Sequence, residues 1–206
     1  MAERGPLVPL KKALRDLVAW LRATRVRGMI IGGVAASLLG RPRLTRDVDV
    51  VVLLEEARWA AFLAAGRRFG FAGRRPDTLA FARRARVFLV RHAPSGIDAD
   101  IAIGALPFEE ESVRRATLRD VGGLSIPVPR PEDLVIMKAV AHRPQDLLDV
   151  DSLIDAHPRL DVRHVRRWVR QFATVLDSPQ ILADLDARLA RRKGRARRRG
   201  MIRPRA

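Results

Sequence analysis

One stretch of the sequence, Ile30 to Val52, sets the strongest limit on how this chain can fold. It reads IIGGVAASLLGRPRLTRDVDVVV and ends with Asp47 and Asp49 inside a run of valines. An apolar run of this length predicts a strand that is buried on both faces. Side chains two positions apart on a strand point to the same face of the sheet. We therefore expect the two carboxylates to lie side by side.

Two carboxylates on one buried face repel each other unless a cation lies between them. Mg²⁺ is the expected cation, because it binds one or two carboxylates together with phosphate oxygens. Gly32 and Gly33 lie just upstream, and a residue without a Cβ lets backbone N–H groups approach a phosphate closely. A glycine pair at this place is more often only a turn. The combination of both motifs predicts phosphoryl or nucleotidyl transfer.

The charge balance points to a polyanionic partner. The chain has 40 Lys and Arg residues against 23 Asp and Glu residues, a formal net charge of +17. Most of the basic residues are arginines, which a genome rich in G and C also favours, but codon bias does not explain the excess over acidic residues. Nucleic acid is the commonest partner of so basic a protein. Cysteine is absent, which excludes disulfides and thiolate metal sites.

The sequence predicts no contact with a membrane. Its first residues lack the pattern of a secretory signal, and the longest uncharged run, Gly28 to Gly40, is too short to span a bilayer. We therefore expect a cytoplasmic enzyme.

Hydrophobic periodicity predicts an α/β half followed by a helical half. In the first half we expect helices over Leu10–Arg25, Val34–Leu39, Glu55–Arg68 and Phe108–Thr117. Strands are expected over Met29–Ile31, Val48–Leu54, Leu79–Phe81, Arg86–Arg91 and Ile97–Ile103, and a hairpin over Val121–Val128. In the second half we expect helices over Leu134–His142, Gln145–Ile154, Val162–Leu176 and Ile181–Ala190.

The predicted organisation is an α/β core over residues 1–125, a helical part over 126–190 that completes the site, and a basic tail over 191–206. The tail reads RRKGRARRRGMIRPRA and contains no acidic residue. A segment of this composition predicts disorder until it meets a partner.

Three segments together resemble the minimal nucleotidyltransferase superfamily, and more narrowly the AbiEii-type nucleotidyltransferases, the toxins of type IV toxin–antitoxin systems. They are GGVAASLLGRPRLTRDVDVVV, ADIAIGALPFEEESVRRA and IPVPRPEDLVIMKAVAHRPQDLLDVDSLI. The resemblance covers roughly Met29 to Ile154. It implies an α+β fold with a mixed sheet flanked by helices and a helical C-terminal part. It also implies transfer of a nucleoside monophosphate from an NTP, with two metal ions held by three carboxylates.

The resemblance assigns roles to individual residues. Gly32 and Gly33 would hold the triphosphate, and Asp47 and Asp49 would hold Mg²⁺, with Mn²⁺ as an alternative ion. The family more often has a serine after the first glycine, so that hydrogen bond would come here from the backbone or from Ser37. Arg43 and Arg46, beside the acids, would neutralise phosphate charge.

The third carboxylate has two candidates, Asp98 and Asp100, which share one strand face. We favour Asp100, because it lies deeper in the apolar run and matches the family's acid before the Pro-Phe-Glu segment. Asp98 would then be exposed or lie behind the metal ligands.

The helical half contributes Lys138, which lies in the apolar stretch LVIMKAVA. A lysine there either extends its ammonium group to the surface or reaches the NTP phosphates. The resemblance favours the second role and makes Asp146 an active-site acid that orients Lys138 or the substrate. Asp146 and Asp149 lie three residues apart, and in a purely structural role they would pair with Arg143.

The expected function is Mg²⁺-dependent transfer of an NMP to an acceptor hydroxyl, with an RNA such as the 3′ end of tRNA as acceptor. A cognate antitoxin is the expected protein partner. One alternative is a small-molecule nucleotidyltransferase of the antibiotic-modifying kind, although its cationic substrates call for an acidic pocket. Another is an inactive nucleic-acid-binding protein, which the intact acid pair disfavours.

Overall fold

A computed structural model describes the backbone of residues 8–201 and the side-chain environments of residues 10–192. The chain divides into two compact units. The first contains the residues up to Leu38 together with Arg43–Arg130, and the second contains Leu39–Pro42 together with the residues from Pro131 onward. The division thus falls after Arg130, because the hairpin strand Ser125–Val128 pairs within the first unit.

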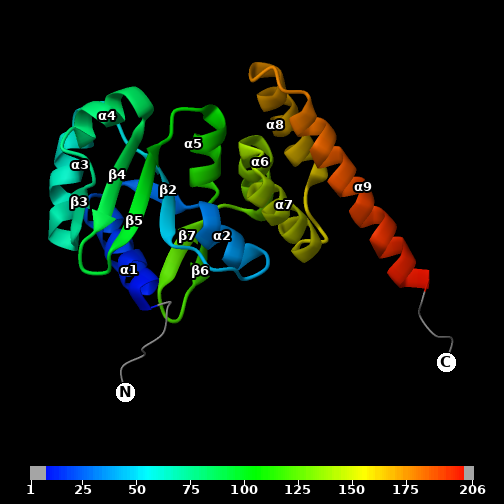
Figure 1. Cartoon of the computed structure of the whole chain (residues 1–206), viewed down its shortest axis with the longest axis horizontal. Helices are drawn as coiled ribbons and strands as arrows, with labels where there is room; N and C mark the ends of the chain where they lie inside the picture. Colours follow the sequence, from blue (N-terminus) through cyan, green and yellow to red (C-terminus); the bar gives the residue numbers. More distant parts are fainter. Residues whose placement is uncertain (1–7, 202–206) are drawn as a thin grey trace. The chain divides into compact units, whose positions relative to one another are not determined.

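A five-stranded mixed sheet forms the centre of the first unit (Figure 1). Its strands are β1 (Arg27–Ile30), β2 (Asp47–Leu53), β3 (Phe71–Gly73), β4 (Val87–His92) and β5 (Ile97–Ile103), in the spatial order β1-β2-β5-β4-β3. Only β2 and β5 pair in parallel, and the other neighbours are antiparallel. The expected mixed sheet flanked by helices is confirmed.

The helices of this unit are α1 (Val8–Ala23), α2 (Gly32–Leu39), α3 (Trp59–Gly66), α4 (Thr78–Ala85) and α5 (Pro107–Arg114). Short 3₁₀ turns, η1 (Glu56–Arg58) and η2 (Arg67–Phe69), flank α3. The strands β6 (Thr117–Asp120) and β7 (Ser125–Val128) form a separate hairpin, as the glycine pair between them predicts.

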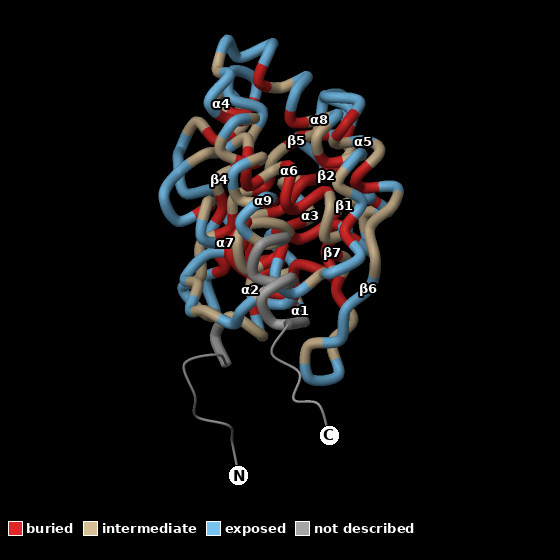
Figure 2. Tube along the Cα trace, turned by 90° about the vertical axis from the view of Figure 1, so that its right-hand side faces the viewer, coloured by how far each residue is buried: buried red, intermediate tan, exposed pale blue. Residues whose placement is uncertain are grey.

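The core of the first unit lies between the sheet and its helices, and the central strands β2 and β5 contribute many of its buried residues (Figure 2). Helix α1 buries Leu14, Leu17, Val18 and Leu21, the 3.6-residue stripe visible in the sequence. Trp20 stacks on Phe62 with ring centroids 4.3 Å apart and donates from its indole nitrogen to the Phe62 carbonyl. Aromatic stacking and hydrogen bonding thus fix α1 against α3.

One predicted element between α3 and β4 is wrong, because the predicted strand at Leu79–Phe81 is part of helix α4. The strand β3 was not predicted from the sequence. A three-residue apolar run fits either period, so tertiary packing decides the outcome. Thr78 and Ala82, four residues apart, both point into the core, and this is the spacing of a helix face.

The second unit contains four helices, α6 (Pro131–Ala141), α7 (Pro144–Ala156), α8 (Val162–Val175) and α9 (Gln180–Met201). They bury a shared apolar core, which includes Leu134, Ile136, Leu153, Val165 and Leu185. Helix α9 continues past Ala190 into the segment that composition predicts to be disordered. Arginine and alanine favour helix, which accounts for the continuation. Residues 202–206 lie outside the described part of the chain. None of the described helices is both long and apolar enough to cross a bilayer.

Candidate active site

Four aspartates gather at the start of the two parallel strands. In the register of β2 and β5, Asp47 lies beside Asp98 and Asp49 lies beside Asp100. All four alternate with core residues, since Val48, Val50, Ala99 and Ile101 are buried on the opposite face. The carboxylates therefore share one face of the sheet, as the period of two predicts for each pair.

Gly32 brings the first turn of α2 against the carboxylate of Asp49. Its φ is +61°, and a Cβ at this position would lie 1.8 Å from Asp49 Oδ2. No other residue type fits without moving the aspartate. The close approach is held by a hydrogen bond from the Ile31 amide to the Asp49 carbonyl, 2.8 Å long. The first amides of a helix lack partners within the helix, so the N-terminus of α2 opens next to the acids.

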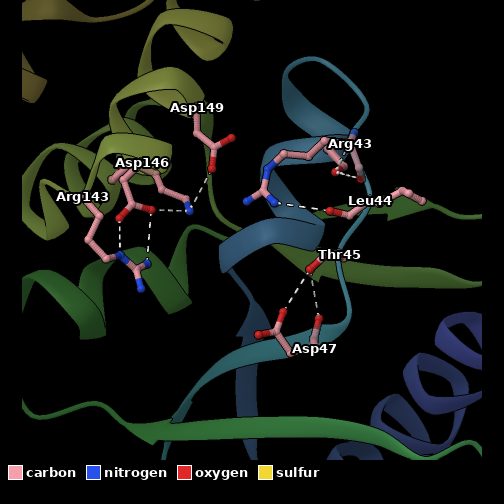
Figure 3. A network of polar contacts seen from close by, with 9 residues as sticks. Arg43, Leu44, Thr45, Asp47, Arg143, Asp146 and Asp149 are labelled. Carbon is pink, nitrogen blue, oxygen red and sulfur yellow. Dashed lines mark hydrogen bonds and ion pairs between the residues drawn. The ribbon is translucent and has the colours of Figure 1, made fainter.

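The loop between α2 and β2 is tied down on both sides (Figure 3). Thr45 donates from its hydroxyl to Asp47 Oδ1 at 3.0 Å. A Cβ on Gly33 would lie 2.6 Å from Thr45 Oγ1. The absence of a side chain on Gly33 therefore leaves room for the Thr45 side chain. Ser37 donates from its hydroxyl to the Arg43 carbonyl at 2.9 Å. The Ser37 hydroxyl hydrogen is thus used inside the loop, and Arg46 lies exposed just before β2.

Asp98 and Asp100 have different environments. Arg91 contacts Asp98 through two bonds of 2.6 and 3.1 Å, and Arg74 bridges Asp98 and Asp100. The Arg91 guanidinium holds the pKa of Asp98 below its ordinary value, and Arg74 adds to this effect. Burial raises the pKa of Asp100, and the carboxylates of Asp47 and Asp98 raise it further, although Arg74 opposes them. Asp100 is therefore the less compensated of the two acids.

Asp47, Asp49 and Asp100 fit a hard divalent cation in their chemistry, because all three offer carboxylate oxygens from one sheet face. Burial accounts for most of the raised pKa of Asp100, and the neighbouring carboxylates of Asp47 and Asp98 add to it. Among the described residues, however, no three acidic or histidine side chains converge on a common metal position as they stand. Arg74 supplies positive charge to Asp98 and Asp100 in this arrangement.

Lys138 and Asp146 belong to the second unit, where they form a buried network (Figure 3 labels its acids and Arg143). Lys138 Nζ lies 2.7 Å from Asp146 and 3.0 Å from Asp149. Arg143 approaches Asp146 at 2.5 Å. Burial tends to raise the pKa of Asp146, but hydrogen bonds from Arg143 and Lys138 outweigh it and leave the pKa lowered. The predicted contact between Lys138 and Asp146 and the structural pairing with Arg143 are therefore both present.

Sequence reasoning missed Thr45, Arg74 and Arg91. Thr45 precedes Asp47 by two residues, and that spacing is the only local signal of its contact. Arg74 follows β3, a strand that the sequence did not predict, so nothing pointed to it. Arg91 lies opposite Asp98 in the pairing of β4 with β5, and its role requires the register between the two strands.

Comparisons with known proteins agree on one class. Residues 29–205 match the family model described as "Nucleotidyl transferase AbiEii toxin, Type IV TA system". Among solved structures, an antigenic nucleotidyltransferase-like protein from Paracoccidioides brasiliensis is similar, with a TM-score of 0.52 and 16% identity over 85% of this chain and 92% of that one. The antibiotic-resistance factor ANT(2″)-Ia has a TM-score of 0.51 and 14% identity over 84% and 94% of the two chains. At such low identity these structures support the fold alone. None of the curated protein sequences matches this chain.

Proposed function

The chain belongs to the AbiEii family of nucleotidyltransferases, and on that premise we propose that it transfers a nucleoside monophosphate from an NTP to an RNA hydroxyl with the help of Mg²⁺. The observation that supports the proposal most is the parallel register that sets Asp49 beside Asp100 and Asp47 beside Asp98. A metal-dependent transferase needs carboxylates converging on one face, and a fold of this size gains no stability from gathering like charges there.

Each site residue has a proposed role. Asp47, Asp49 and Asp100 hold the metal ions, and Asp98 stays in its ion pairs with Arg91 and Arg74. Gly32 and Gly33 bring the amides of the first turn of α2 to the triphosphate. Lys138, oriented by Asp146, neutralises phosphate charge. We leave Ser37 out of the triphosphate site, because its hydroxyl hydrogen is already donated to Arg43.

The reaction is an exchange at the α-phosphorus of the NTP. The acceptor oxygen forms a bond to this phosphorus, the bond to the β-phosphate oxygen breaks, pyrophosphate leaves, and the hydroxyl proton passes to solvent. Mg²⁺ held by Asp47, Asp49 and Asp100 would supply charge stabilisation and would lower the pKa of the acceptor hydroxyl. The chain's own residues contribute positioning, and no covalent enzyme intermediate is needed.

An RNA acceptor is favoured by the net charge of +17, since neutralising phosphates gives affinity that does not depend on sequence. The first test incubates the protein with each α-³²P-labelled NTP, Mg²⁺ and total tRNA. We expect label in the tRNA band with at least one NTP, and none after EDTA is added. A parallel incubation replaces the tRNA with an aminoglycoside. Label in the aminoglycoside and not in RNA would contradict the RNA assignment and favour a small-molecule transferase.

Three matched variants test the site itself. Asp49→Asn and Asp100→Asn should lower transfer by at least a hundredfold, because each removes a proposed metal ligand. Asp98→Asn should retain much more activity, because Asp98 is held by Arg91 and Arg74. Equal activity in Asp49→Asn and the unmodified protein would refute the proposal, and loss in Asp98→Asn with activity in Asp100→Asn would exchange the two assignments.

The family model describes a toxin of a type IV system, so we also propose that unrestrained expression inhibits growth and that a cognate antitoxin relieves it. Growth of a host induced for the unmodified protein or for Asp49→Asn tests this role. Equal growth of the two cultures, with transfer still detected in vitro, would contradict the toxin role and leave the enzymatic one intact.

A further inference from the structure

An arginine cluster lies on the first unit at the junction of α1 and β1. Arg22 lies in the last turn of α1, Arg25 follows the end of this helix, and Arg27 begins β1. With Arg114 of α5 they line a hollow of about 610 Å³. Its remaining walls are mostly apolar and include Val18, Leu21, Val26, Val113, Leu118 and Pro127. The hollow thus combines positive charge with surface suited to sugars and bases.

The positive charge of this cluster is not compensated by any residue whose side-chain environment the structure describes. Arg22, Arg25 and Arg27 are all exposed. Within residues 10–192, no carboxylate pairs with any of the three, and none of their guanidinium groups makes a hydrogen bond. Some arginines of the same unit are paired, for example Arg83 with Glu56 and Arg115 with Glu111. Unpaired guanidinium groups around a hollow suit a ligand with several negative charges.

Arg25 occupies a backbone position that normally selects glycine. Its φ is +53°. The Val26 amide bonds to the Leu21 carbonyl and the Arg25 amide to the Arg22 carbonyl. These are the two hydrogen bonds of a Schellman motif, in which the left-handed residue is usually glycine. A cation near a helix C-terminus is favourable, but Arg22 already supplies one in the last turn. The strained arginine therefore indicates a use outside the fold.

The cluster lies at the far end of β2 from the acids. Arg27 pairs with Leu53, whereas Asp47 and Asp49 begin the strand. The four residue-to-residue steps from Asp49 to Leu53 span roughly 13 Å at the rise of an extended strand. A polynucleotide whose end is held at the acids is long enough to reach the cluster.

We propose that Arg22, Arg25 and Arg27 bind backbone phosphates of the RNA acceptor and hold it while its end reaches the acids. The inference rests on the proposed function, because it takes the RNA as the substrate of that site. It adds the place where the body of the acceptor docks.

The test measures binding of fluorescein-labelled tRNA by anisotropy, without NTP or divalent metal, over a range of salt concentrations. The triple variant R22Q/R25G/R27Q should raise the Kd at least tenfold at low salt. Its slope of log K against log salt should become shallower by about 2, since each phosphate contact contributes roughly 0.7–0.9. The control triple R68Q/R83Q/R84Q removes the same charge from exposed arginines and should change the Kd less than threefold.

Single glycine variants separate docking from folding. Arg25→Gly should weaken tRNA binding several-fold while the Tm stays equal or rises, because glycine suits this conformation. Arg86 is the matched control, with φ +52° and a guanidinium that bonds to the Ile103 carbonyl at 3.3 Å. Arg86→Gly should lower the Tm and leave tRNA binding unchanged. If Arg25 had only a structural role, Arg25→Gly would lower the Tm and leave tRNA binding unchanged.

The outcomes also distinguish this inference from the proposed function. Asp49→Asn should bind tRNA as tightly as the unmodified protein, because binding is measured without the reaction. If the unmodified protein transfers no label but binds tRNA through the three arginines, only the proposed function is contradicted. The docking site would be overturned if both triple variants weakened tRNA binding equally, or if R22Q/R25G/R27Q left the slope of log K against log salt unchanged. It would also be overturned if polyglutamate competed for the protein as strongly as unlabelled tRNA.

Discussion

Gly32 is the residue whose size matters most for the candidate site. A methyl group there would meet Asp49 Oδ2 at 1.8 Å, and φ is +61°. We predict that Gly32→Ala loses nearly all transferase activity, measured by label incorporation, because it displaces a proposed metal ligand. Gly96→Ala is the control, since Gly96 has φ +71° but no atom within 4 Å of the added methyl.

Gly96→Ala should lose roughly 1–2 kcal/mol of stability in urea unfolding, the cost of a left-handed alanine, and Gly32→Ala should lose at least as much, because its methyl group also clashes with Asp49. Only Gly32→Ala should also lose activity. If Gly96→Ala were equally inactive, backbone strain would explain the loss and the contact with Asp49 would not.

Lys138 compensates two buried acids, Asp146 and Asp149, at 2.7 and 3.0 Å. Lys138→Met should therefore lower the free energy of unfolding by about 3–5 kcal/mol, because it removes the ammonium group that both buried carboxylates contact. The double variant Lys138→Met with Asp146→Asn should recover part of this loss. If the single variant unfolds at the same urea concentration as the unmodified protein, the network contributes little to stability.

For individual residues, the two-residue repeat of a strand predicted that Asp47 and Asp49 share one face of the sheet. It predicted the same for Asp98 and Asp100. It did not predict Arg74, which contacts Asp98 and Asp100 from a loop. Such a contact depends on how β3 and β4 pair, and hydrophobic periodicity carries no information on that pairing.

At the scale of elements, helix α8 begins with a charged cap. Asp161 accepts a hydrogen bond from the His164 amide at 3.0 Å, and this bond lowers the pKa of Asp161. A lowered pKa in the folded state gives stability that is present above the ordinary aspartate pKa and lost as pH falls through the folded value. We predict that Asp161→Ala lowers the Tm near neutral pH, and that the difference narrows at acidic pH.

Asp161→Asn is the matched variant, because asparagine also accepts the amide hydrogen bond. Its Tm should lie closer to that of the unmodified protein and depend less on acidic pH. Equal pH dependence of all three proteins in thermal unfolding would show that the Asp161 charge does not stabilise α8.

The long elements were predicted correctly, and the element whose type was predicted wrongly is short. The stripe of α1 and the apolar runs of β2 and β5 fixed both type and approximate bounds. Helix α4 has only eight residues and buries two of them, Thr78 and Ala82, so its pattern is too short to specify a period. The charged end of α9 differs from its prediction for another reason. Its composition predicts disorder, but arginine also favours a helix, and the helix continues to Met201.

At the scale of the whole molecule, the excess of positive charge should govern association with RNA. With a net charge of +17, we expect the association rate with tRNA to fall steeply as salt rises from 50 to 300 mM, because screening shortens the range of the attraction. Stopped-flow fluorescence measures this rate. A rate independent of salt would contradict electrostatic steering.

The most direct test of the acid site is calorimetric titration of Mn²⁺ into the protein with a non-hydrolysable NTP analogue. We predict metal-dependent nucleotide binding by the unmodified protein, its loss in Asp49→Asn, and its retention in Asp120→Asn, which alters an exposed acid of the β6–β7 hairpin. If Asp49→Asn bound the metal and nucleotide as tightly as the unmodified protein, the aspartates of β2 and β5 would not be the metal site.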